Sequence, residues 1–490
     1  MKLRELLAGL DFAEIAGDRA VEVTGLAYDS RWVERGTLFF CVRGGRSDGH
    51  DFAQGAVERG AGALVVERHL DLDVPQVRVP DARAAMPPIA VRFFGDPTAR
   101  LRVAGVTGTN GKTTTAFLIR HVLESQGIRT GLLGTVKRVV GGVDEEVERT
   151  TPEAIDLQRT CRRMLDAGDA ACAMEVSSHA LALKRTEGAR FAVAVFTNLS
   201  QDHLDFHRGM DDYFSAKRLL FTSGQAARAL VNLDDRYGAR LAAAIDCLTF
   251  SPSGAEAADF RALDVTFDIT GSRFLCRAPD AETEVRMPLP GHFNVENALA
   301  ALGACYVLGV PTEVGGAALP DADRIPGRFE PIEEGQPFAV LVDYAHTPDS
   351  LENLLQAARR LTEGRLITVF GCGGDRDREK RPLMGRIAER LSDLCVVTSD
   401  NPRSEDPGAI IAQILGGVSR PDQVEVQPDR RAAIALALSA AQRGDTVVIA
   451  GKGHEQGQEL ERGQKIPFDD RQVARDELAR VASARLTPGA

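Results

Sequence analysis

The sequence predicts an α/β fold with largely parallel sheets, divided into three domains. Short apolar runs alternate with amphipathic helical patterns over most of the chain after residue 100, as in strand–helix–strand units. Polar clusters follow these runs, and ligands of open α/β sheets bind beyond the carboxyl ends of the strands. The length of 490 residues favours about three domains, at roughly 150 residues each. Turn-rich segments at 94–98 and 325–331 place the boundaries, giving domains 1–98, 99–328 and 329–490.

Composition excludes several classes of protein. The net charge is −11 at pH 7, so a broad nucleic-acid-binding surface is not expected. The eight cysteines include no C-x-x-C pair, which favours a reducing compartment over a disulfide framework or a zinc ribbon. We find neither a signal-peptide core nor an apolar run near the ~18 residues of a membrane span. We expect a cytoplasmic enzyme without a nucleic acid partner or a membrane span, and we expect it to be a monomer.

The most informative segment is the loop 108–114, Gly-Thr-Asn-Gly-Lys-Thr-Thr, between an apolar run at 101–106 and a helical pattern. A strand, a glycine loop and a helix N-terminus in this order bind nucleotide phosphates, with Lys112 as counter-charge and Thr113 as a Mg²⁺ ligand. A glycine-rich turn that only caps the helix is the alternative. The loop is a variant, because Val106 stands where the general motif has glycine. The apolar face of the helix is predicted to comprise Ala116, Ile119, Val122 and Leu123.

Six further polar clusters directly follow apolar runs that are typical of strands. They lie at 175–179, 197–203, 343–346, 371–376, 400–403 and 451–455. Any one of them could be no more than a polar turn. Together they predict a ligand site at the carboxyl ends of the strands, in a cleft between domains.

Three residues of these segments have a structural interpretation beside the functional one. Glu175 can anchor Mg²⁺, because this ion takes oxygen ligands and keeps several waters. His203, considered alone, is more typical of a hydrogen-bonded structural histidine than of a magnesium ligand. Lys217 lies in an amphipathic helical pattern at 211–221 and, considered alone, is typical of a solvated lysine.

Asn294 and Arg403 also have both a structural and a functional interpretation. Asn294 precedes an apolar helix predicted over 298–308 and suits its N-cap. Arg403 ends the motif Asp-Asn-Pro-Arg at 400–403. This motif is either a turn with an exposed arginine or a site where Arg403 pairs bidentately with a carboxylate.

The motifs, taken in order, resemble the Mur ligases over essentially the whole chain. They are the variant loop, Glu-Val-Ser-Ser-His, Asp-His-Leu-Asp, His-Phe-Asn-x-x-Asn, Pro-Gly-Arg-Phe-Glu, Asp-Tyr-Ala-His-Thr-Pro, Gly-Cys-Gly-Gly-Asp-Arg-Asp, Asp-Asn-Pro-Arg and Gly-Lys-Gly-His-Glu. The resemblance implies a small α/β N-terminal UDP-binding domain, a central P-loop-type ATPase domain with a mainly parallel sheet, and a C-terminal Rossmann-like domain.

The resemblance also implies the reaction, which is an ATP-dependent, ADP-forming ligation in peptidoglycan biosynthesis with ATP and Mg²⁺. The D-glutamate carboxylate of UDP-MurNAc-L-Ala-D-Glu attacks the γ-phosphate of ATP, and the amine of the incoming amino acid then displaces phosphate from the acyl phosphate. Asp-Asn-Pro-Arg is the form linked with meso-2,6-diaminopimelate, because Arg403 is suited to clamp its distal carboxylate. Lysine-adding relatives lack this arginine.

The roles of individual residues follow from the same resemblance. The catalytic residues are Lys112, Glu175, His203 and Lys217. The metal site comprises Thr113, Glu175, His203 and Lys217, the last as a carbamate. ATP is contacted by Gly108, Thr109, Asn110, Gly111, Lys112, Thr113, Thr114, Asn294, Arg328 and Asp343. The UDP-sugar dipeptide is contacted by Ser30, Gly45, Arg46, Ser47, Thr150, Thr151, Ser177 and Arg185, and diaminopimelate by Arg376, Asp400, Asn401, Pro402, Arg403, Gly451 and Glu455.

One position departs from the family pattern, and two rival functions are weighed. Leu183 stands where many relatives have glutamine, which puts one polar substrate contact in doubt. Besides a lysine-adding homologue, the chain could be a folylpolyglutamate-synthase-like ligase, which shares the acyl-phosphate chemistry but needs neither residues 1–98 nor Asp-Asn-Pro-Arg. A GTPase switch is disfavoured, because no asparagine is followed by lysine and the Asn-Lys-x-Asp signature is therefore missing.

Overall fold

The computed structural model describes residues 1–10, 14–45 and 47–486, and it confirms the mixed α/β architecture. The chain divides into two compact units. The first comprises Met1–Thr107, Gln126–Val195 and Ala216–Ala229. The second comprises Gly108–Ser125, Phe196–Ser215 and Leu230–Ala490.

The first unit begins with a five-stranded sheet of order β1-β5-β4-β3-β2. Neighbouring strands run parallel except β1 and β5. Successive side chains of a strand point to opposite faces, so Leu38 and Phe40 pack with α1 and α3 whereas Phe39 packs with α2. The elements are α1 (Leu3–Leu6), β1 (Glu14–Ala16), β2 (Gly25–Ala27), β3 (Thr37–Phe40), α2 (Ala53–Glu58), β4 (Ala63–Val66), β5 (Gln76–Arg78) and α3 (Ala82–Phe94).

A second group of strands in the first unit includes the strand before the glycine loop. β6 (Arg102–Thr107) pairs in parallel with β10 (Ala171–Glu175), which pairs in parallel with β7 (Thr130–Leu133). Val106 of β6 lies opposite Glu175 of β10, so the chain leaves both strands at the same edge. The remaining elements are β8 (Arg138–Val140), β9 (Val143–Glu145), α5 (Ala154–Asp166), α6 (Ser178–Ala182) and β11 (Val193–Phe196).

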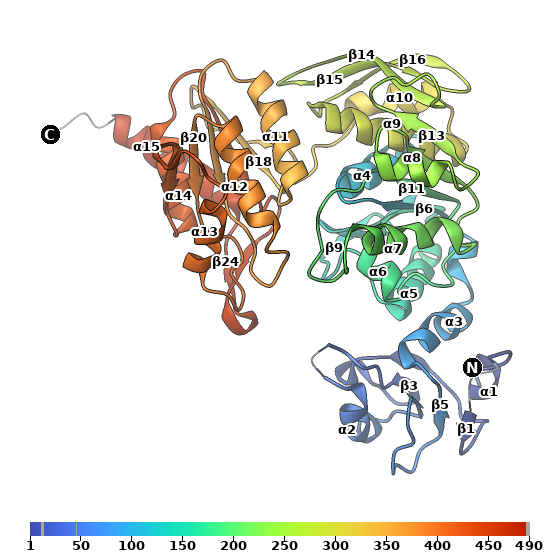
Figure 1. Ribbon diagram of the computed structural model, residues 1–490. Helices are drawn as coiled ribbons and strands as arrows, with labels where there is room; N and C mark the ends of the chain where they lie inside the picture. The colour runs from blue at the N-terminus through green and yellow to red at the C-terminus, as the bar shows by residue number, and fades with distance from the viewer. Residues whose placement is uncertain (11–13, 46, 487–490) are drawn as a thin grey trace. The chain divides into compact units, whose positions relative to one another are not determined.

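In the second unit, α4 (Lys112–Ser125) packs along α9 (His292–Val307). The face of α4 predicted to be apolar is fully buried, as the exposures of Ala116, Ile119, Val122 and Leu123 show. Figure 1 shows α9 and α10 beside the strands β14 to β16. The elements are α8 (Arg236–Ala242), β12 (Ala229–Asn232), β13 (Leu248–Ser251), β14 (Phe260–Asp268), β15 (Gly271–Arg277), β16 (Glu282–Met287) and α10 (Thr312–Ala318), and α7 (Met210–Thr222) contributes to both units.

The start of α9 differs from the sequence prediction. The helix begins at His292, with Gly291 as its N-cap, so the interpretation of Asn294 as the N-cap of a helix over 298–308 was wrong. Asn294 is buried in the first turn, and its side-chain amide donates a hydrogen bond to the carbonyl of Pro290 (2.8 Å). Burial with a hydrogen-bond partner overrides the local preference of asparagine for helix caps.

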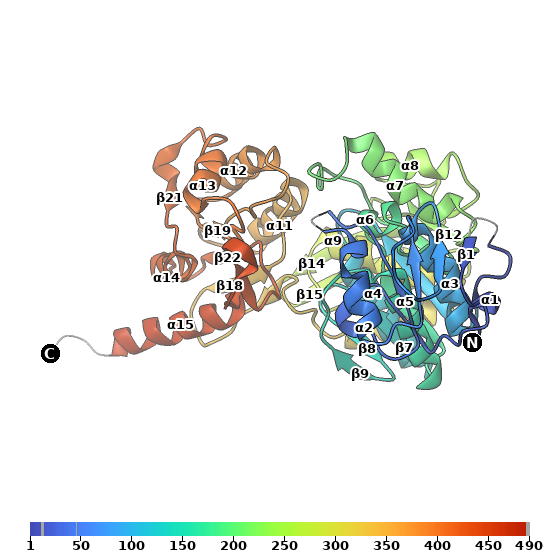
Figure 2. The same cartoon turned by 90° about the horizontal axis from the view of Figure 1, so that it is seen from below.

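The C-terminal part of the second unit is a sheet of order β17-β18-β22-β19-β20-β21 with helices on both faces. Phe370 packs with α11, α12 and α13, whereas Ile367 and Val369 of the same strand pack with α14 and α15. Figure 2 shows α12 and α13 on one side of these strands and α15 on the other. The elements are β17 (Glu330–Pro331), β18 (Ala339–Asp343), α11 (Pro348–Arg360), β19 (Leu366–Phe370), α12 (Lys380–Leu391), β20 (Leu394–Val397), α13 (Pro407–Leu415), β21 (Val424–Val426), α14 (Arg430–Ala440), β22 (Thr446–Ala450), β23 (Gly457–Glu459), β24 (Lys465–Pro467) and α15 (Asp470–Leu486).

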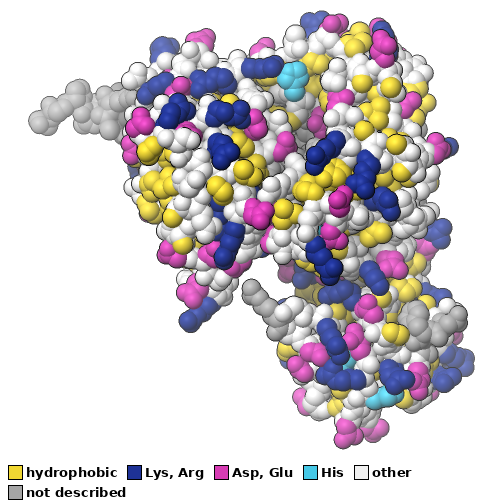
Figure 3. All heavy atoms as spheres, viewed as in Figure 1, with side chains coloured by type: hydrophobic (Ala, Val, Ile, Leu, Met, Phe, Trp, Pro, Cys, Tyr) yellow, Lys and Arg dark blue, Asp and Glu magenta, His cyan; other side chains and the backbone are white. Residues whose placement is uncertain are grey.

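The apolar runs that precede the predicted polar clusters form β6, β10, β11, β18, β19, β20 and β22, as predicted. Basic and acidic side chains are interspersed on the face that Figure 3 draws. Within the described part of the chain, no helix combines the length and the apolar composition that crossing a bilayer requires.

Candidate functional site

Two positions of the loop before α4 require glycine. A Cβ atom at Gly108 (φ +155°) would lie 1.9 Å from Thr197 Oγ1, and one at Gly111 (φ +85°) would lie 2.4 Å from Asn297 Oδ1. At these two positions the loop therefore approaches its neighbours too closely for a side chain. It leads directly into the N-terminus of a 14-residue helix, and the positive end of the helix dipole favours an anion.

Lys112 of the loop and Val106, the residue that stands where the general motif has glycine, explain the variant motif. Lys112 Nζ donates hydrogen bonds to the carbonyls of Gly108 (2.9 Å) and Thr109 (2.8 Å), so the loop wraps round the ammonium group. Val106 is a fully buried residue of β6, and its carbonyl accepts a hydrogen bond from Val176 N (2.8 Å). The position at which the general motif has glycine is thus a strand residue here, and the turn starts later.

Polar residues after β11 and at the start of α11 hold the glycine loop. The Asn110 backbone N–H donates to Asn198 Oδ1 (2.9 Å), and the Asn110 side chain donates to Asp349 Oδ2 (2.7 Å). Asn198 also donates to Glu296 of α9 (2.9 Å). Burial raises the pKa of Glu296 to about 8, and the charges of Asp349 and Asp235 act in the same direction. Glu296, Asp349 and Asp235 therefore form an acidic cluster behind the asparagines that hold the loop.

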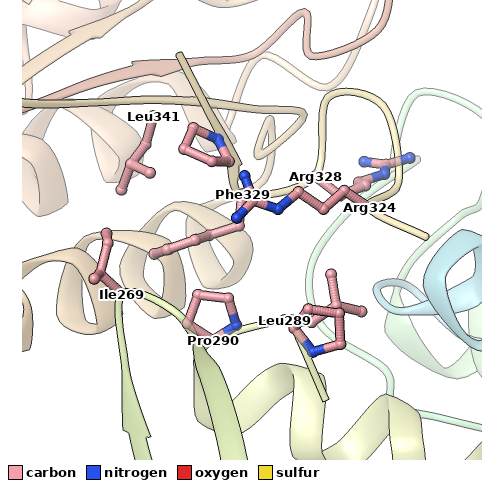
Figure 4. Close-up of a pocket in the computed structure, with 9 residues that line it drawn as sticks. Ile269, Leu289, Pro290, Arg324, Arg328, Phe329 and Leu341 are labelled. Carbon is pink, nitrogen blue, oxygen red and sulfur yellow. The ribbon is translucent and has the colours of Figure 1, made fainter. Parts of the chain in front are cut away.

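Arg328, Asp343 and Asn294, which were predicted to contact ATP, lie in the second unit with the loop. Arg328 Nη2 donates to Thr113 Oγ1 (3.1 Å), and the guanidinium lies over the Tyr344 ring, 4.3 Å from its centroid. Burial raises the pKa of Asp343, whereas Arg328 opposes the rise. Figure 4 shows Arg328 and Arg324 with apolar residues of a small pocket, among them Pro290 next to the start of α9.

In the first unit, Glu175 and three predicted substrate contacts converge. The carboxylate of Glu175, which is buried, accepts hydrogen bonds from Thr135 N (2.7 Å) and Thr135 Oγ1 (3.0 Å). Thr135 Oγ1 is also 3.0 Å from Thr150 Oγ1. Thr151 Oγ1 donates to the Glu175 carbonyl (2.9 Å) and accepts from Ser177 N (3.1 Å). Thr135 was missed, because a threonine after an apolar strand carries no signal of its own.

Arg185 joins this cluster through a second residue that sequence reasoning missed. Its guanidinium donates to the Thr151 carbonyl (3.3 Å) and pairs with Glu153 (3.0 Å). Glu153 in turn accepts from Arg83 (2.9 Å). Burial lowers the pKa of Arg185, and Glu153 acts against that change. Leu183, which replaces the usual glutamine, is the C-cap of the short helix α6.

A cavity of about 450 Å³ in the first unit is lined by both aromatic and charged side chains. Of the residues predicted to contact the UDP-sugar, only Thr150 is among its lining residues; Ser30, Gly45 and Ser47 are not. Arg46 lies outside the described residues. The cavity instead includes Tyr28 and Trp32, whose ring centroids are 6.0 Å apart. This aromatic pair flanks Ser30 in the sequence and was not predicted.

His203 adjoins a buried ion pair in the second unit. It adopts a left-handed backbone conformation (φ +56°), and its neighbour Asp202 pairs with Lys380 of α12 (3.3 Å). The rings of His203 and His346 lie 3.4 and 3.7 Å from the Asp202 carboxylate. Burial acts to raise the pKa of Asp202, but Lys380 and the two histidines hold it well below its usual range. Asp202 and Lys380 were missed, although Asp202 opens the motif Asp-His-Leu-Asp and Lys380 lies three residues after Gly-Cys-Gly-Gly-Asp-Arg-Asp.

Lys217 is not the solvated lysine that its helical pattern indicated. Its side chain is 1% exposed, because it lies on the inner side of α7. Of the predicted metal-site residues, Thr113 and His203 belong to the second unit, and Glu175 and Lys217 to the first. Among the described residues, no three His, Cys, Asp or Glu side chains are grouped to hold a metal ion. Oxygen donors from Thr113 and Glu175 nevertheless have the chemistry that Mg²⁺ prefers.

The loops after β19, β20 and β22 carry the residues predicted to bind the amino acid, and we therefore call residues 371–376, 400–403 and 451–459 the amino-acid pocket. Asn401 Nδ2 donates to Glu455 Oε2 (2.9 Å), and the buried Lys452 donates to both Asn401 Oδ1 (2.9 Å) and Glu455 Oε2 (2.7 Å). Asp400 Oδ2 is buried and has no hydrogen-bond partner among the described residues, although it lies 4.0 Å from Arg430 Nη1. The pocket thus offers a carboxylate oxygen that a cationic ligand could satisfy.

Two arginines of the pocket, Arg403 and Arg376, lie near Gly373. Arg403 adopts φ +51°, and its Nη1 donates to the Gly374 carbonyl (2.8 Å) while its Nε donates to Glu459 Oε2 (2.9 Å). A Cβ atom at Gly373 would lie 3.0 Å from Arg403 Nη1 and 3.7 Å from Arg376 Cγ, so both predicted arginines flank this glycine. Arg403 is therefore not the freely exposed turn arginine of the alternative interpretation.

Buried charges that sequence reasoning missed support these loops. Arg430 is fully buried, pairs with Asp470 (2.7 Å), and donates to the carbonyls of Ala450 (2.9 Å) and Ser399 (3.3 Å) at the ends of two strands. Asp470 and Asp400 raise the pKa of Arg430 against the opposing effect of burial. Arg430 opens α14 and Asp470 opens α15, and a charged residue at the start of a helix is too common to select them.

Three segments of the chain match models of Mur ligase domains. Residues 22–93 match the Mur ligase family, catalytic domain, residues 106–305 the Mur ligase middle domain, and residues 327–453 the Mur ligase, glutamate ligase domain. Together they cover most of the chain, including the glycine loop and most of the amino-acid pocket.

Relatives match over almost the whole chain. The UDP-N-acetylmuramoyl-L-alanyl-D-glutamate–2,6-diaminopimelate ligase of Syntrophomonas wolfei is 46% identical over 98% of this chain and 99% of its own. The enzyme of the same name from Gloeobacter violaceus is 47% identical over 99% of each chain. A solved structure of a ligase of that name is 33% identical, with a TM-score of 0.69 over 100% of each chain. The resemblance found in the motifs is confirmed, and the chain belongs to the Mur ligase family.

Proposed function

We propose that the chain is an ATP-dependent, ADP-forming ligase that joins meso-2,6-diaminopimelate to the D-glutamate side-chain carboxylate of UDP-MurNAc-L-Ala-D-Glu in peptidoglycan biosynthesis. Relatives of 46 and 47% identity bear this activity in their names. We assign the UDP-sugar to residues 1–98, ATP to 99–328 and the amino acid to 329–490, a division that the three family matches support.

The amino-acid pocket is the single observation that carries the choice of diaminopimelate. The far end of this amino acid bears an ammonium group and a carboxylate, and it needs an anion and a cation from the protein. Asp400 Oδ2 is a buried acceptor without a hydrogen-bond partner among the described residues. Arg403, 19% exposed at its side chain, supplies the cation. L-lysine has no distal carboxylate and would leave Arg403 unmatched.

The reaction brings the D-glutamate carboxylate to the negatively charged γ-phosphate of ATP, so the protein must offset negative charge. A carboxylate oxygen of D-glutamate attacks the γ-phosphorus of ATP, the bond to the bridging oxygen breaks, and ADP leaves with the electron pair. The amine then attacks the acyl carbon, the bond to phosphate breaks, and the nitrogen loses a proton. Lys112 and the N–H groups at the start of α4 offset the charge of the phosphates. Asp400 and Arg403 hold the far end of the amino acid, which orients its reacting amine.

Mg²⁺, when bound, would neutralise phosphate charge at this site. Thr113 and Glu175 would hold it with oxygen donors, and His203 would complete the protein ligands. We also propose that Lys217 is a carbamate, formed by addition of its neutral amine to carbon dioxide with loss of a proton. Lys217 is buried, which supports a role inside the protein rather than that of a solvated surface lysine. Enzyme labelled with ¹³C-bicarbonate should give a carbamate carbon resonance that Lys217→Ala lacks.

Phosphate release from ATP tests the proposal directly. We expect release only when both UDP-MurNAc-L-Ala-D-Glu and meso-diaminopimelate are present, and we expect L-lysine to support little turnover. Equal turnover with L-lysine would contradict the amino acid assignment. Turnover with a folate and glutamate in place of the UDP-sugar would contradict the ligase class.

A further inference from the structure

Arg403 of the amino-acid pocket is held by a carboxylate that belongs to the chain itself. Its Nε donates to Glu459 Oε2 at 2.9 Å, and its Nη1 donates to the Gly374 carbonyl at 2.8 Å. Two of the three guanidinium nitrogens are therefore occupied. Among the residues that the structure describes, Nη2 has no partner, so one edge of the guanidinium remains for a ligand.

The hairpin formed by β23 and β24 fixes Glu459 beside the pocket. The Glu459 backbone N–H donates to Asn401 Oδ1 (2.9 Å), and the Glu459 carbonyl accepts from the Arg403 N–H (3.1 Å). The preceding residue, Gln458, donates to the Asp400 carbonyl (2.5 Å). The hairpin thus contacts three of the four residues of the motif at 400–403, and Glu459 approaches Arg403 through both backbone and side chain.

The backbone of Arg403 makes this support necessary. A non-glycine residue at φ +51° is strained and persists only where its surroundings determine it. An arginine side chain with free rotamers would spread its charge over many positions and lose entropy on binding. Fixing Nε and Nη1 in advance removes much of that cost, as preorganisation does generally. It also fixes the direction in which Nη2 points.

We propose that Glu459 is a specificity-determining positioning residue that orients Arg403 for the distal carboxylate of diaminopimelate. The inference rests on the proposed function, because it assumes that Arg403 receives this carboxylate. Glu459 itself does not touch the reacting groups. Its effect should therefore be confined to amino acids that carry a distal carboxylate.

Two substitutions at Glu459 and one nearby control test the inference. Glu459→Ile removes the acceptor of the Nε hydrogen bond, whereas Glu459→Gln keeps an oxygen acceptor and loses only the charge. Glu461→Gln is the control, because Glu461 lies on the same hairpin with its side chain 74% exposed and 3.8 Å from Arg462. For each variant the KM values for meso-diaminopimelate, ATP and UDP-MurNAc-L-Ala-D-Glu are measured, together with the melting temperature and with turnover on L-lysine.

We expect Glu459→Ile to raise the KM for diaminopimelate about tenfold, the factor that corresponds to ~1.4 kcal/mol. The KM values for the other substrates, the turnover with L-lysine and the melting temperature should stay within twofold. Glu459→Gln should recover most of the affinity, and Glu461→Gln should match the unchanged enzyme.

Other outcomes distinguish the role of Glu459 from the assignment of the amino-acid pocket. A KM for diaminopimelate that is unchanged in Glu459→Ile would overturn the role of Glu459. A lowered KM would overturn it too, since Glu459 would then compete with the ligand carboxylate. If Arg403→Ala leaves this KM unchanged, the assignment of the pocket fails, and the inference fails with it. If Arg403→Ala raises it but Glu459→Ile does not, only the inference on Glu459 is lost.

Discussion

The glycine loop and the amino-acid pocket bind charged ligands by different means. The loop at 108–114 uses backbone: two glycines that admit no Cβ atom, carbonyls that wrap Lys112, and the N-terminus of α4. The pocket uses side chains from three separate strand ends, joined by contacts such as Asn401–Glu455 and Arg403–Glu459. Phosphates are common to many nucleotides, so a generic backbone cradle suffices. One amino acid must be distinguished from another, and that requires charges at defined positions.

The largest expected effect removes the only side-chain charge of the loop. Lys112→Ala should reduce ADP formation by at least about 10²-fold, the scale of losing one preorganised electrostatic contact. ADP production is measured with all substrates at saturation. Lys137→Ala, which alters a lysine on a surface hairpin paired with Asp144 (2.8 Å), serves as the control. Retained activity in Lys112→Ala would show that the loop does not act on the phosphates.

A second substitution tests whether the loop is a backbone device. Gly111→Ala places a Cβ atom 2.4 Å from Asn297 Oδ1, whereas Gly127→Ala, at a similar φ of +70°, places one in open space. Both variants should lose about 1–2 kcal/mol of stability from the left-handed conformation. Only Gly111→Ala should also raise the KM for ATP, by about tenfold or more, the equivalent of ~1.4 kcal/mol. Equal ATP KM values in the two variants would remove the steric requirement.

Binding in the amino-acid pocket should depend on the Arg403 side chain, whereas binding by the glycine loop should depend on its backbone. Arg403→Ala should raise the KM for meso-diaminopimelate by about tenfold to a hundredfold, since a hydrogen bond to a charged group contributes ~1.5–3 kcal/mol. Arg462→Ala is a matched control, because Arg462 also has positive φ (+60°) and its side chain is 90% exposed. Steady-state kinetics at saturating ATP measure both. A similar KM in the two variants would exclude Arg403 from the pocket.

The acidic support of the loop should make the stability of the protein depend on pH. The folded-state pKa of Glu296, about 8, exceeds its ordinary value of 4.5, so the folded protein binds a proton that the unfolded chain has released. Stability should fall as pH rises from about 4.5 through about 8. Glu296→Gln should remove that part of the slope in melting temperature, and Glu313→Gln, at an exposed helix position, should keep it. Parallel slopes for all three proteins would contradict the raised pKa.

Much of the fold and many of the candidate residues could be predicted, because they depend on short-range patterns. The apolar runs before 175–179, 371–376 and 451–455 are strands, since strands buried at every position are continuous apolar runs. The prediction for Asn294 failed for the opposite reason. Its preference for a helix cap was overridden by burial and by the hydrogen bond to Pro290, neither of which is local in the sequence.

Lys217 and Glu459 are candidate functional residues whose positions could not be predicted from local sequence either. The pattern around Lys217 indicates a surface position, and only the packing of α7 places it at 1% exposure. Glu459 carries no motif signal, and its importance appears only when the hairpin brings it within 2.9 Å of Arg403. Pairings between distant segments are created by tertiary structure, so no spacing rule could have identified them.

By itself, the sequence determined the α/β class, the family resemblance and the glycine loop, because each is encoded in contiguous residues whose backbone geometry follows from their type. Only the tertiary structure decided how the pocket holds its charges. Asp400, Arg403, Lys452 and Glu459 come from different strand ends and a hairpin, and their hydrogen bonds exist only once the sheet has set those ends side by side. The residue types within each motif indicate the classes of ligand, whereas long-range packing orients the groups that distinguish one ligand from another.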